Sequence, residues 1–160
     1  MNIIEYTKKY EEEVKNLLVE LQEYIAEIDD WQLNIMTPEY RETYFKKNIK
    51  PDLSKENKIF LAVDDGAVLG MIFGKIMEYD EEDKCCYACP KAAEIKELIV
   101  SKSARGKGVG KKLLEAMEEY FKGIGCEYCH IDVFEPNVGG LRFYEREGYI
   151  TRMRTVSKKL

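Results

Sequence analysis

Three glycines alternate with other residues at Gly106, Gly108 and Gly110, between an apolar stretch and a stretch with apolar residues at helical spacing. This pattern predicts a strand, a glycine turn and a helix that begins near Val109. Glycine permits a tight turn and lets a ligand approach the backbone closely. A helix that begins at such a turn directs unpaired N–H groups and the positive end of its dipole into the turn. The stretch therefore predicts an anion site, and a phosphate suits it best.

Positive charge is concentrated around these glycines and is not a property of the whole chain. Residues 101–112 carry five basic side chains and no acidic one, whereas the whole chain has a formal net charge of -5. Nucleic-acid-binding proteins spread basic residues over a larger face. We therefore expect the positive charge to serve a small anionic ligand, and we expect no nucleic-acid partner.

Two common phosphate motifs do not fit the spacing. A P-loop has four residues between its glycines and a hydroxyl residue after its lysine, but three residues separate Gly106 from Gly110, and Lys112 stands where the hydroxyl would be. A dinucleotide fingerprint has two residues between its second and third glycines, and here there is one. The remaining pattern is Arg105-x-x-Gly108-x-Gly110.

This pattern resembles the R/Q-x-x-G-x-G/A signature of the GNAT superfamily of acyl-CoA N-acyltransferases. Residues 94–100 resemble the fourth strand of that family, which leads into the loop. Residues 137–149 are similar to its N-x-x-A-x-x-F-Y-x-x-x-G-F stretch, with Gly140 in place of alanine and Tyr149 in place of phenylalanine. Together these stretches cover roughly a third of the chain.

The resemblance implies that acetyl-CoA is a co-substrate, with its pyrophosphate on the glycine loop, and that no metal takes part. Asn137 resembles the family residue that hydrogen-bonds the pantetheine arm or an ordered water. The residues that the resemblance assigns to the cofactor are Leu98, Ile99, Val100, Arg105, Gly106, Lys107, Gly108, Val109, Gly110, Lys111 and Asn137.

Acetyl transfer to an amine requires a base for the ammonium proton, stabilisation of an oxyanion and a proton for the leaving thiolate. Tyr144 occupies the position of the tyrosine that many family members use as the acid. Glu94 matches a strand glutamate that some members use as the base, through a water molecule, and Glu97 is the second choice. The cysteines lie outside these positions, which disfavours an acyl-cysteine intermediate.

Two other functions stay open: a CoA-binding regulatory module without turnover, and a zinc- or thiol-dependent interaction domain. Cys86-x-x-Cys89 and Cys126-x-x-Cys129 could together form a zinc site, and Cys126 to His130 matches the C-x-x-C-H haem-attachment pattern. The alternation around His130 instead favours a half-buried strand.

Length and composition set further bounds. The chain has 160 residues, of which 45% are hydrophobic, and we expect residues 1–160 to form a single N-acetyltransferase domain. No stretch approaches the roughly 18 apolar residues of a membrane span, and no signal peptide is recognisable, so we expect a cytoplasmic protein without a membrane partner. The five cysteines are then expected to be reduced thiols.

The elements expected from periodicity and the resemblance make an α+β, GNAT-like fold with a mixed central β-sheet flanked by helices, in the order βααβββαβαβ. In chain order, the expected features are a strand at 2–6, a helix at 10–28, a helix opened by Thr37-Pro38, a hairpin turn at 64–67, a polar turn at 80–83, a strand at 92–100, a helix ending near 123–125, a strand at 128–134, a helix at 138–147 and a last strand at 149–156.

Within the strand at 92–100, Ile95, Leu98 and Val100 are spaced three and then two apart, which breaks strict alternation and predicts a bulge. In the family, such a distortion separates two parallel strands and exposes the backbone groups that bind the pantetheine arm.

The acceptor is expected to be a primary amine, either a small molecule or a peptide. Acidic residues outside the basic loop favour a cationic one, namely Asp29, Asp30, the run at 80–83 and Glu94. The aromatic residues Trp31, Tyr40, Tyr44 and Phe45 lie where the family builds its acceptor-side wall. A homodimer is possible by resemblance.

Overall fold

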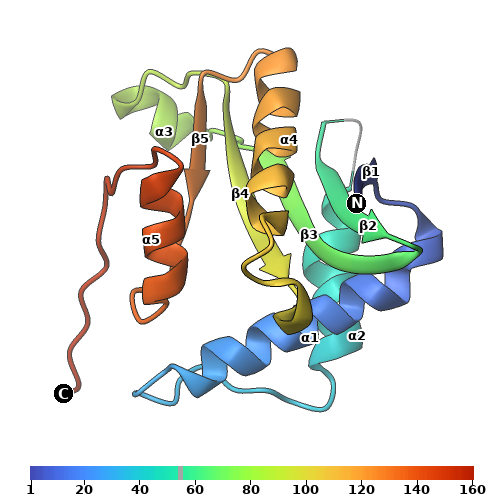
Figure 1. Cartoon of the computed structure of the whole chain (residues 1–160). Helices are drawn as coiled ribbons and strands as arrows, with labels where there is room; N and C mark the ends of the chain where they lie inside the picture. Colours follow the sequence, from blue (N-terminus) through green and yellow to red (C-terminus); the bar gives the residue numbers. More distant parts are fainter. Residues whose placement is uncertain (54–55) are drawn as a thin grey trace.

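The computed structural model describes residues 1–53 and 56–160. Over these residues a five-stranded sheet lies between helices (Figure 1). The strands and α-helices are β1 (Asn2–Glu5), α1 (Glu11–Glu27), α2 (Tyr40–Tyr44), β2 (Lys58–Asp64), β3 (Ala67–Ile76), α3 (Glu81–Cys86), β4 (Ala92–Val100), α4 (Val109–Gly123), β5 (Tyr128–Ile131) and α5 (Val138–Arg146). A π-helical turn, Phe45–Ile49, follows α2 directly.

The strands lie in the order β1-β2-β3-β4-β5. The first four are antiparallel, and β5 runs parallel to β4 after the crossover through α4. The hairpin turn between β2 and β3 is confirmed: Asp64 pairs with Ala67, and Asp65 and Gly66 between them have φ angles of 47° and 82°. Two positive φ values are typical of the tight turns that suit twisted strands. The mixed sheet agrees with the predicted fold class.

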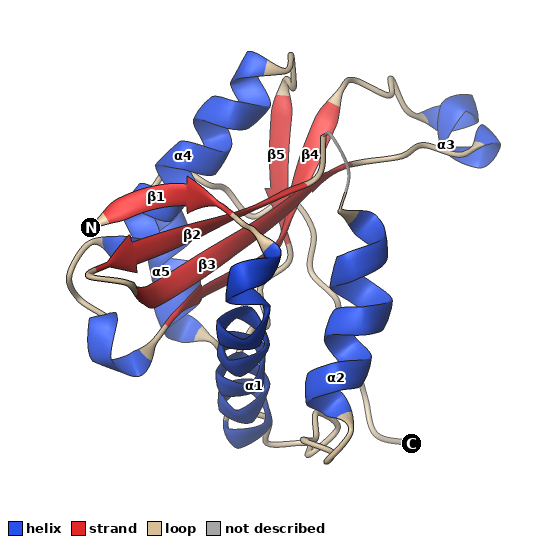
Figure 2. Cartoon of the chain, turned by 90° about the vertical axis from the view of Figure 1, so that its right-hand side faces the viewer, coloured by secondary structure: helices blue, strands red, loops and turns tan. Residues whose placement is uncertain are grey.

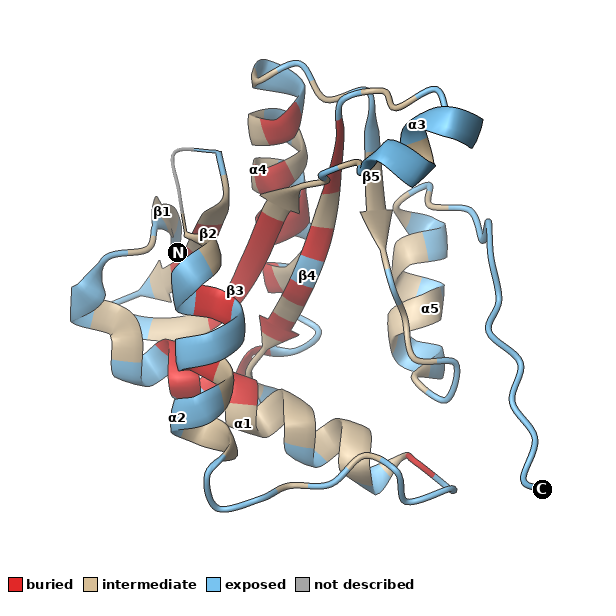
Figure 3. Ribbon diagram, turned by 180° about the vertical axis from the view of Figure 1, so that it is seen from behind, coloured by how far each residue is buried: buried red, intermediate tan, exposed pale blue. Residues whose placement is uncertain are grey.

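Each face of the sheet carries its own hydrophobic core. Figure 2 shows α1 and α2 on one face and α4 and α5 on the other. The core under α1 and α2 includes Leu18, Phe45 and Ile99, and the core under α4 includes Ile95 and Phe121. The buried residues concentrate in the central strands and in the helix faces that cover them (Figure 3). Among the described residues, no helix has both the length and the apolar character that crossing a bilayer requires.

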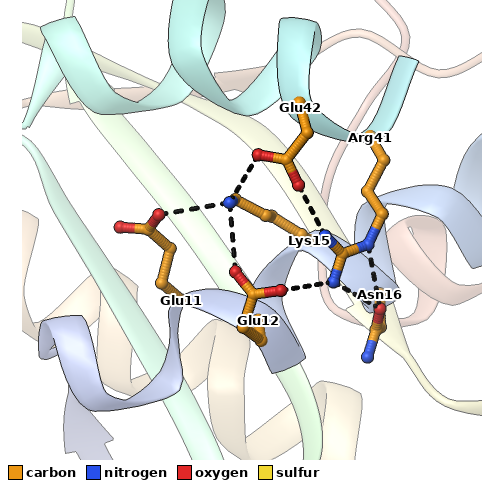
Figure 4. A network of polar contacts seen from close by, with 6 residues as sticks. All are labelled: Glu11, Glu12, Lys15, Asn16, Arg41 and Glu42. Atoms are coloured by element: carbon orange, nitrogen blue, oxygen red, sulfur yellow. Dashed lines mark hydrogen bonds and ion pairs between the residues drawn. The ribbon is translucent and has the colours of Figure 1, made fainter. Parts of the chain in front are cut away.

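Helices α1 and α2 are joined by an ion network (Figure 4). The residues drawn are Glu11, Glu12, Lys15, Asn16, Arg41 and Glu42. The buried ammonium of Lys15 lies 2.7 Å from Glu42, 3.1 Å from Glu12 and 3.2 Å from Glu11. The guanidinium of Arg41 pairs with Glu12 at 2.7 Å and with Glu42. A buried ammonium is tolerated when it is paired in this way, so the network fixes α2 against α1.

The bulge predicted in β4 is confirmed. On β3, Phe73 pairs with Glu97 and the next residue, Gly74, pairs with Ile95, so Lys96 has no partner on β3. One extra residue reverses the alternation of the side chains that follow it. Accordingly Ile95 packs in the core under α4, while Ile99, four residues later, packs in the core under α1 and α2.

The last predicted strand, at 149–156, is wrong. Residues 149–160 have no regular secondary structure, and the side chains of Ile150, Met153 and Val156 are 81%, 87% and 90% exposed. A strand needs a neighbour to pair with. Tyr149 instead packs against the core under α4, where its hydroxyl lies 3.0 Å from Glu118 and 3.4 Å from the Cys129 sulfur on β5, so it meets β5 through its side chain and not through a backbone ladder.

Three other boundaries differ from expectation. The polar run at 80–83 starts α3: the Asp80 carboxylate accepts hydrogen bonds from the backbone N–H groups of Glu82 and Asp83, and the Asp83 side chain accepts from the Asp80 N–H. This capping box makes the run a helix start. Thr37-Pro38 does not cap α2, which begins at Tyr40 without a side-chain cap. Strand β5 ends at Ile131 instead of Phe134.

Gly74 provides a test of the packing between β3 and α4. A Cβ atom there would lie 2.4 Å from Cζ of Phe121 and 2.8 Å from Sδ of Met117. We expect Gly74→Ala to lower the free energy of unfolding by about 1–3 kcal/mol because the core would be overpacked. Gly123→Ala is the control, because nothing lies within 4 Å of a Cβ there. Urea unfolding that gives both variants the same stability would contradict this packing.

Candidate active site

Strands β4 and β5 pair only along part of their length. The register runs from Ala92 opposite Tyr128 to Ile95 opposite Ile131, and no β5 residue pairs with 96–100. The backbone edge of β4 beyond the bulge is therefore not paired with β5, and such an edge can hydrogen-bond an extended ligand. The candidate cofactor residues Leu98, Ile99 and Val100 lie on this part of β4.

The glycine loop follows directly. Gly108 has a φ angle of 77° and is the residue that precedes α4, and Gly106 has a φ angle of 74°. An ideal Cβ at either glycine would meet no atom within 4 Å, so their conformation, and not crowding by the protein, explains their identity. The protein therefore leaves free space beside the two glycines that precede α4, and the first N–H groups of a helix are unpaired donors suited to an anion.

Arg105 is held by protein groups. Its Nε donates to the carbonyl oxygen of Val100 at 3.1 Å, its guanidinium lies 3.5 Å from the Glu20 carboxylate, and it stacks over the Tyr24 ring at 5.6 Å. The Glu20 carboxylate also accepts a hydrogen bond from the Lys102 N–H at 2.6 Å. These contacts tie both the start of the loop and Arg105 to α1.

Lys111 is also paired. Its ammonium lies 2.7 Å from the Glu147 carboxylate next to α5 and 3.5 Å from Glu115, and the hydrogen bond to Glu147 raises the Lys111 pKa. Within the described part of the chain, Lys107 and Lys112 form no ion pair. The same holds for the side chain of Lys102, so three of the five basic side chains at 101–112 are available to an anion.

Asn137 caps α5. Its Oδ1 accepts hydrogen bonds from the Gly140 N–H at 3.0 Å and from the Tyr24 hydroxyl at 3.3 Å. A Cβ at Gly140 would lie 2.6 Å from Nδ2 of Asn137, which explains why glycine fits here in place of the expected alanine. The cap connects α5 to α1 across the open ends of β4 and β5.

Glu97 is a carboxylate in the protein interior. It is 8% exposed, lies opposite Phe73 on the α1–α2 face, and accepts a hydrogen bond from the Tyr44 hydroxyl at 2.5 Å. Burial raises the Glu97 pKa, although the Tyr44 hydrogen bond and the positive charge of Lys96 act in the opposite direction. A carboxylate whose pKa is raised is a better base near neutral pH.

Glu94 lies on the same face but in different surroundings. Its neighbours Ala93 and Ile95 pack under α4, so its own side chain is on the opposite face, next to His130 in the register. The Lys96 ammonium binds its carboxylate at 2.9 Å, and the Glu94 side chain is 21% exposed. Glu94 and Glu97 thus lie on the same face of the sheet, on either side of the bulge, and Glu97 is the more deeply buried of the two.

Tyr144 lies on α5, with its ring edge-on to those of Phe143 and Tyr149 at 5.1 and 5.6 Å. Its hydroxyl has no hydrogen-bond partner among the residues that the structure describes. Burial raises the Tyr144 pKa, and the negative charge of Glu97 raises it further. The phenol therefore stays protonated at neutral pH and interacts electrostatically with Glu97.

The cysteines are dispersed. Cys126 and Cys129 pack against the core under α4, and burial raises the pKa of the Cys129 thiol to about 11. Cys85 and Cys86 are exposed on α3. No group of three or more His, Cys, Asp or Glu side chains suited to a metal occurs in the described ranges. The buried Cys129 thiol stays protonated at neutral pH and is therefore a poor nucleophile.

Two of the expected acceptor-side features have other roles. The Asp29 carboxylate accepts hydrogen bonds from the backbone N–H groups of Trp31, Leu33 and Asn34 at 2.8–3.0 Å, and these bonds lower its pKa. It therefore organises the loop after α1. Of the four aromatic residues expected in an acceptor-side wall, Phe45 is buried in the core. Tyr44 and Tyr40 interact with Glu97.

The comparisons with known proteins agree with this arrangement. Residues 24–149 match the acetyltransferase (GNAT) family. The chain belongs to this family. An N-acetyltransferase of Methanocaldococcus jannaschii without an assigned substrate is 35% identical over 97 residues, and a spermine N(1)-acetyltransferase assigned in Bacillus subtilis subsp. natto is 29% identical over 87 residues. These matches cover 60% and 53% of this chain, and the chain spans about half the length of these two relatives, 54% of each.

Solved GNAT structures share the whole fold. A Pyrococcus furiosus protein assigned as an acetyl transferase superposes with a TM-score of 0.74 and 25% identity, over 99% of both chains. An aminoglycoside N-acetyltransferase solved in complex with CoA superposes with a TM-score of 0.68 and 18% identity, over 99% of this chain and 98% of the other. At such low identity, the second likeness concerns the fold alone.

The glycine loop yields a binding test with a matched control. Gly108→Val puts a side chain into the free space in front of α4, and we expect the affinity for acetyl-CoA to fall by at least tenfold. Gly66→Val imposes a similar backbone strain, because Gly66 also has a positive φ and free space around it, but it lies in the β2–β3 turn. Isothermal titration calorimetry should separate the two, and equal affinities would rule out the loop as the phosphate site.

Proposed function

We propose that this GNAT protein transfers the acetyl group of acetyl-CoA to a primary amine by direct attack in a ternary complex. The observation that carries the proposal is the buried carboxylate of Glu97, which accepts a hydrogen bond from Tyr44 and lies on β4 shortly before the glycine loop and α4. Tyr144 on α5 adds a phenol that burial keeps protonated. Such a set of groups supplies a base, an acid and a cofactor site.

Acetyl-CoA binding is supported by three features. The start of α4 and the open glycines suit the pyrophosphate, with Lys107 and Lys112 as additional positive charges. The part of β4 that lacks a β5 partner suits an extended pantetheine arm with amide groups. The Asn137 amide at the start of α5 is a further polar group for the arm.

We assign the base to Glu97 in preference to Glu94. Amine acceptors arrive as ammonium ions, and a carboxylate with a raised pKa accepts their proton more readily, either directly or through a water molecule. Glu94 is more exposed and is paired with Lys96. The neutral amine nitrogen then attacks the thioester carbonyl, a C–N bond forms, and the C–S bond breaks.

Tyr144 supplies the proton of the leaving thiol. The negative charge of Glu97 contributes to the raised pKa of Tyr144, so the phenol is a weak acid while Glu97 is ionised. Once Glu97 has taken the ammonium proton, that charge is neutralised and the phenol becomes a stronger acid. Acid and base are therefore coupled in the order that the reaction needs. As the C–S bond breaks, the attacking nitrogen loses its second proton, which restores the Tyr144 phenol, and the products are an amide, CoA thiol and the proton held by Glu97.

A direct transfer is favoured over an acyl-cysteine route because the raised pKa of Cys129 keeps that thiol protonated. The names of the relatives suggest the class of acceptor: one is assigned as a spermine acetyltransferase and one solved structure is an aminoglycoside acetyltransferase. Both names denote polycationic amines, and a buried carboxylate on the acceptor face is compatible with such substrates.

The test is release of CoA thiol from acetyl-CoA in the presence of spermine, spermidine, an aminoglycoside, a neutral amine or a lysine peptide, each measured against acetyl-CoA hydrolysis without amine. We expect at least one cationic amine to raise thiol release well above hydrolysis and to be recovered as its acetamide. Binding of acetyl-CoA without any acetylated product would instead support a regulatory module.

The role of Glu97 predicts a loss of rate. Glu97→Gln keeps the shape of the side chain and removes the base, so kcat should fall by roughly 10²-fold with little change in acetyl-CoA affinity. Glu94→Gln is the matched control on the same strand and should keep most of the activity. The reverse order of effects in steady-state kinetics would transfer the role to Glu94.

The role of Tyr144 is tested in the same way. Tyr144→Phe keeps the ring in its aromatic cluster and removes the proton, so kcat should fall by roughly 10²-fold. Tyr128→Phe is the control, since Tyr128 is 53% exposed on β5. Rapid-quench measurements should attribute the loss to the chemical step, and an unchanged chemical step would exclude Tyr144 as the acid.

A further inference from the structure

Helix α2 brings two tyrosines to the buried carboxylate. The Tyr44 hydroxyl donates to Glu97 at 2.5 Å, across 53 residues of sequence. The Tyr40 ring stacks on that of Tyr44, with centroids 4.9 Å apart and planes 21° from parallel, and its hydroxyl forms no hydrogen bond to Glu97 in the described part of the chain. Tyr44 therefore hydrogen-bonds Glu97, and Tyr40 on the same helix stacks on Tyr44.

The position of Tyr44 is fixed from both sides. Two residues before it, Glu42 binds the buried ammonium of Lys15 on α1 at 2.7 Å (Figure 4). Directly after it, the π-helical turn Phe45–Ile49 anchors α2, because the first and last side chains of the turn are buried in the core. Single π-helical turns are rare, and they often occur at functional sites. The Tyr44 hydroxyl is therefore held rigidly against the sheet.

We propose that Tyr44 is a positioning residue for acetyl transfer: its hydroxyl holds the Glu97 carboxylate in place and stabilises its negative charge. The inference rests on the proposed role of Glu97 as the base. It assigns to α2 a part in catalysis, in addition to any contact with the acceptor.

The groups that face Glu97 define the expected pH effect. They are Tyr40 and Tyr44 from α2, Lys96 from β4 and Tyr144 from α5. Burial raises the pKa of Glu97, while the Tyr44 hydrogen bond and the Lys96 charge lower it. Removal of the Tyr44 hydroxyl should therefore raise the Glu97 pKa further, and less of the enzyme would then carry an ionised base at a given acidic pH.

The experiment compares Tyr44→Phe and Tyr40→Phe with wild type in pH profiles of kcat/KM with one amine. For Tyr44→Phe we expect kcat/KM to fall by roughly tenfold on the acidic limb and the difference to close as pH rises. Tyr40→Phe should shift the profile less than Tyr44→Phe, because the Tyr40 hydroxyl forms no hydrogen bond to Glu97 among the described residues. A loss of equal size at every pH, or no loss, would overturn the proposal.

A second measurement does not depend on activity. The carboxyl of Glu97 can be titrated by ¹³C NMR in glutamate-labelled protein, with its signal identified by its loss in Glu97→Gln. Tyr44→Phe should raise this pKa. If the Glu97 pKa is the same in Tyr44→Phe as in wild type, Tyr44 does not stabilise the Glu97 carboxylate, and the base role of Glu97 is unaffected. A titration that moves without any change in the pH profile of kcat/KM overturns both the base role of Glu97 and the catalytic part of Tyr44.

Discussion

The bulge at Lys96 is the constraint on which the site depends. One extra residue on β4 reverses the alternation of side chains, so that Ile95 faces α4 and Ile99 faces α1 and α2. The same reversal turns Glu97 toward α1 and α2. Pairing with β5 also ends at Ile95, immediately before the bulge, so that the buried carboxylate and the backbone edge without a β5 partner begin at the same point of β4.

A carboxylate buried at this point requires compensation, since an uncompensated buried charge is costly. The Tyr44 hydroxyl supplies a hydrogen bond and Lys96 supplies a positive charge. Because Tyr44 belongs to a five-residue helix, which is too short to be stable alone, its place depends on the ions that join α2 to Lys15 on α1. An ion network on the outer side of α2 therefore supports a carboxylate on its inner side.

Local signals predicted much of this arrangement. The spacing of the glycines and of the apolar residues after them predicted α4, and the Asp65-Gly66 turn predicted the β2–β3 hairpin, because both depend on residues close in sequence. The broken alternation predicted the bulge but not its residue, which left the choice between Glu94 and Glu97 open. The bond from Tyr44 to Glu97 joins segments 53 residues apart and has no local signal. The strand at 149–156 was expected as the last strand of the predicted order, without a pairing partner, and the segment has no regular secondary structure.

Two of the basic side chains near the glycine loop are bound to other groups of the protein. Arg105 is engaged by Val100 and Glu20, and Lys111 by Glu147, so these side chains hold the loop to β4, α1 and the end of α5. An anion at the loop would then be met first by backbone N–H groups that the fold has already oriented. Such groups lose little freedom on binding, unlike flexible lysines. The ion pairs thus preorganise the loop, and the protein leaves free space beside Gly106 and Gly108.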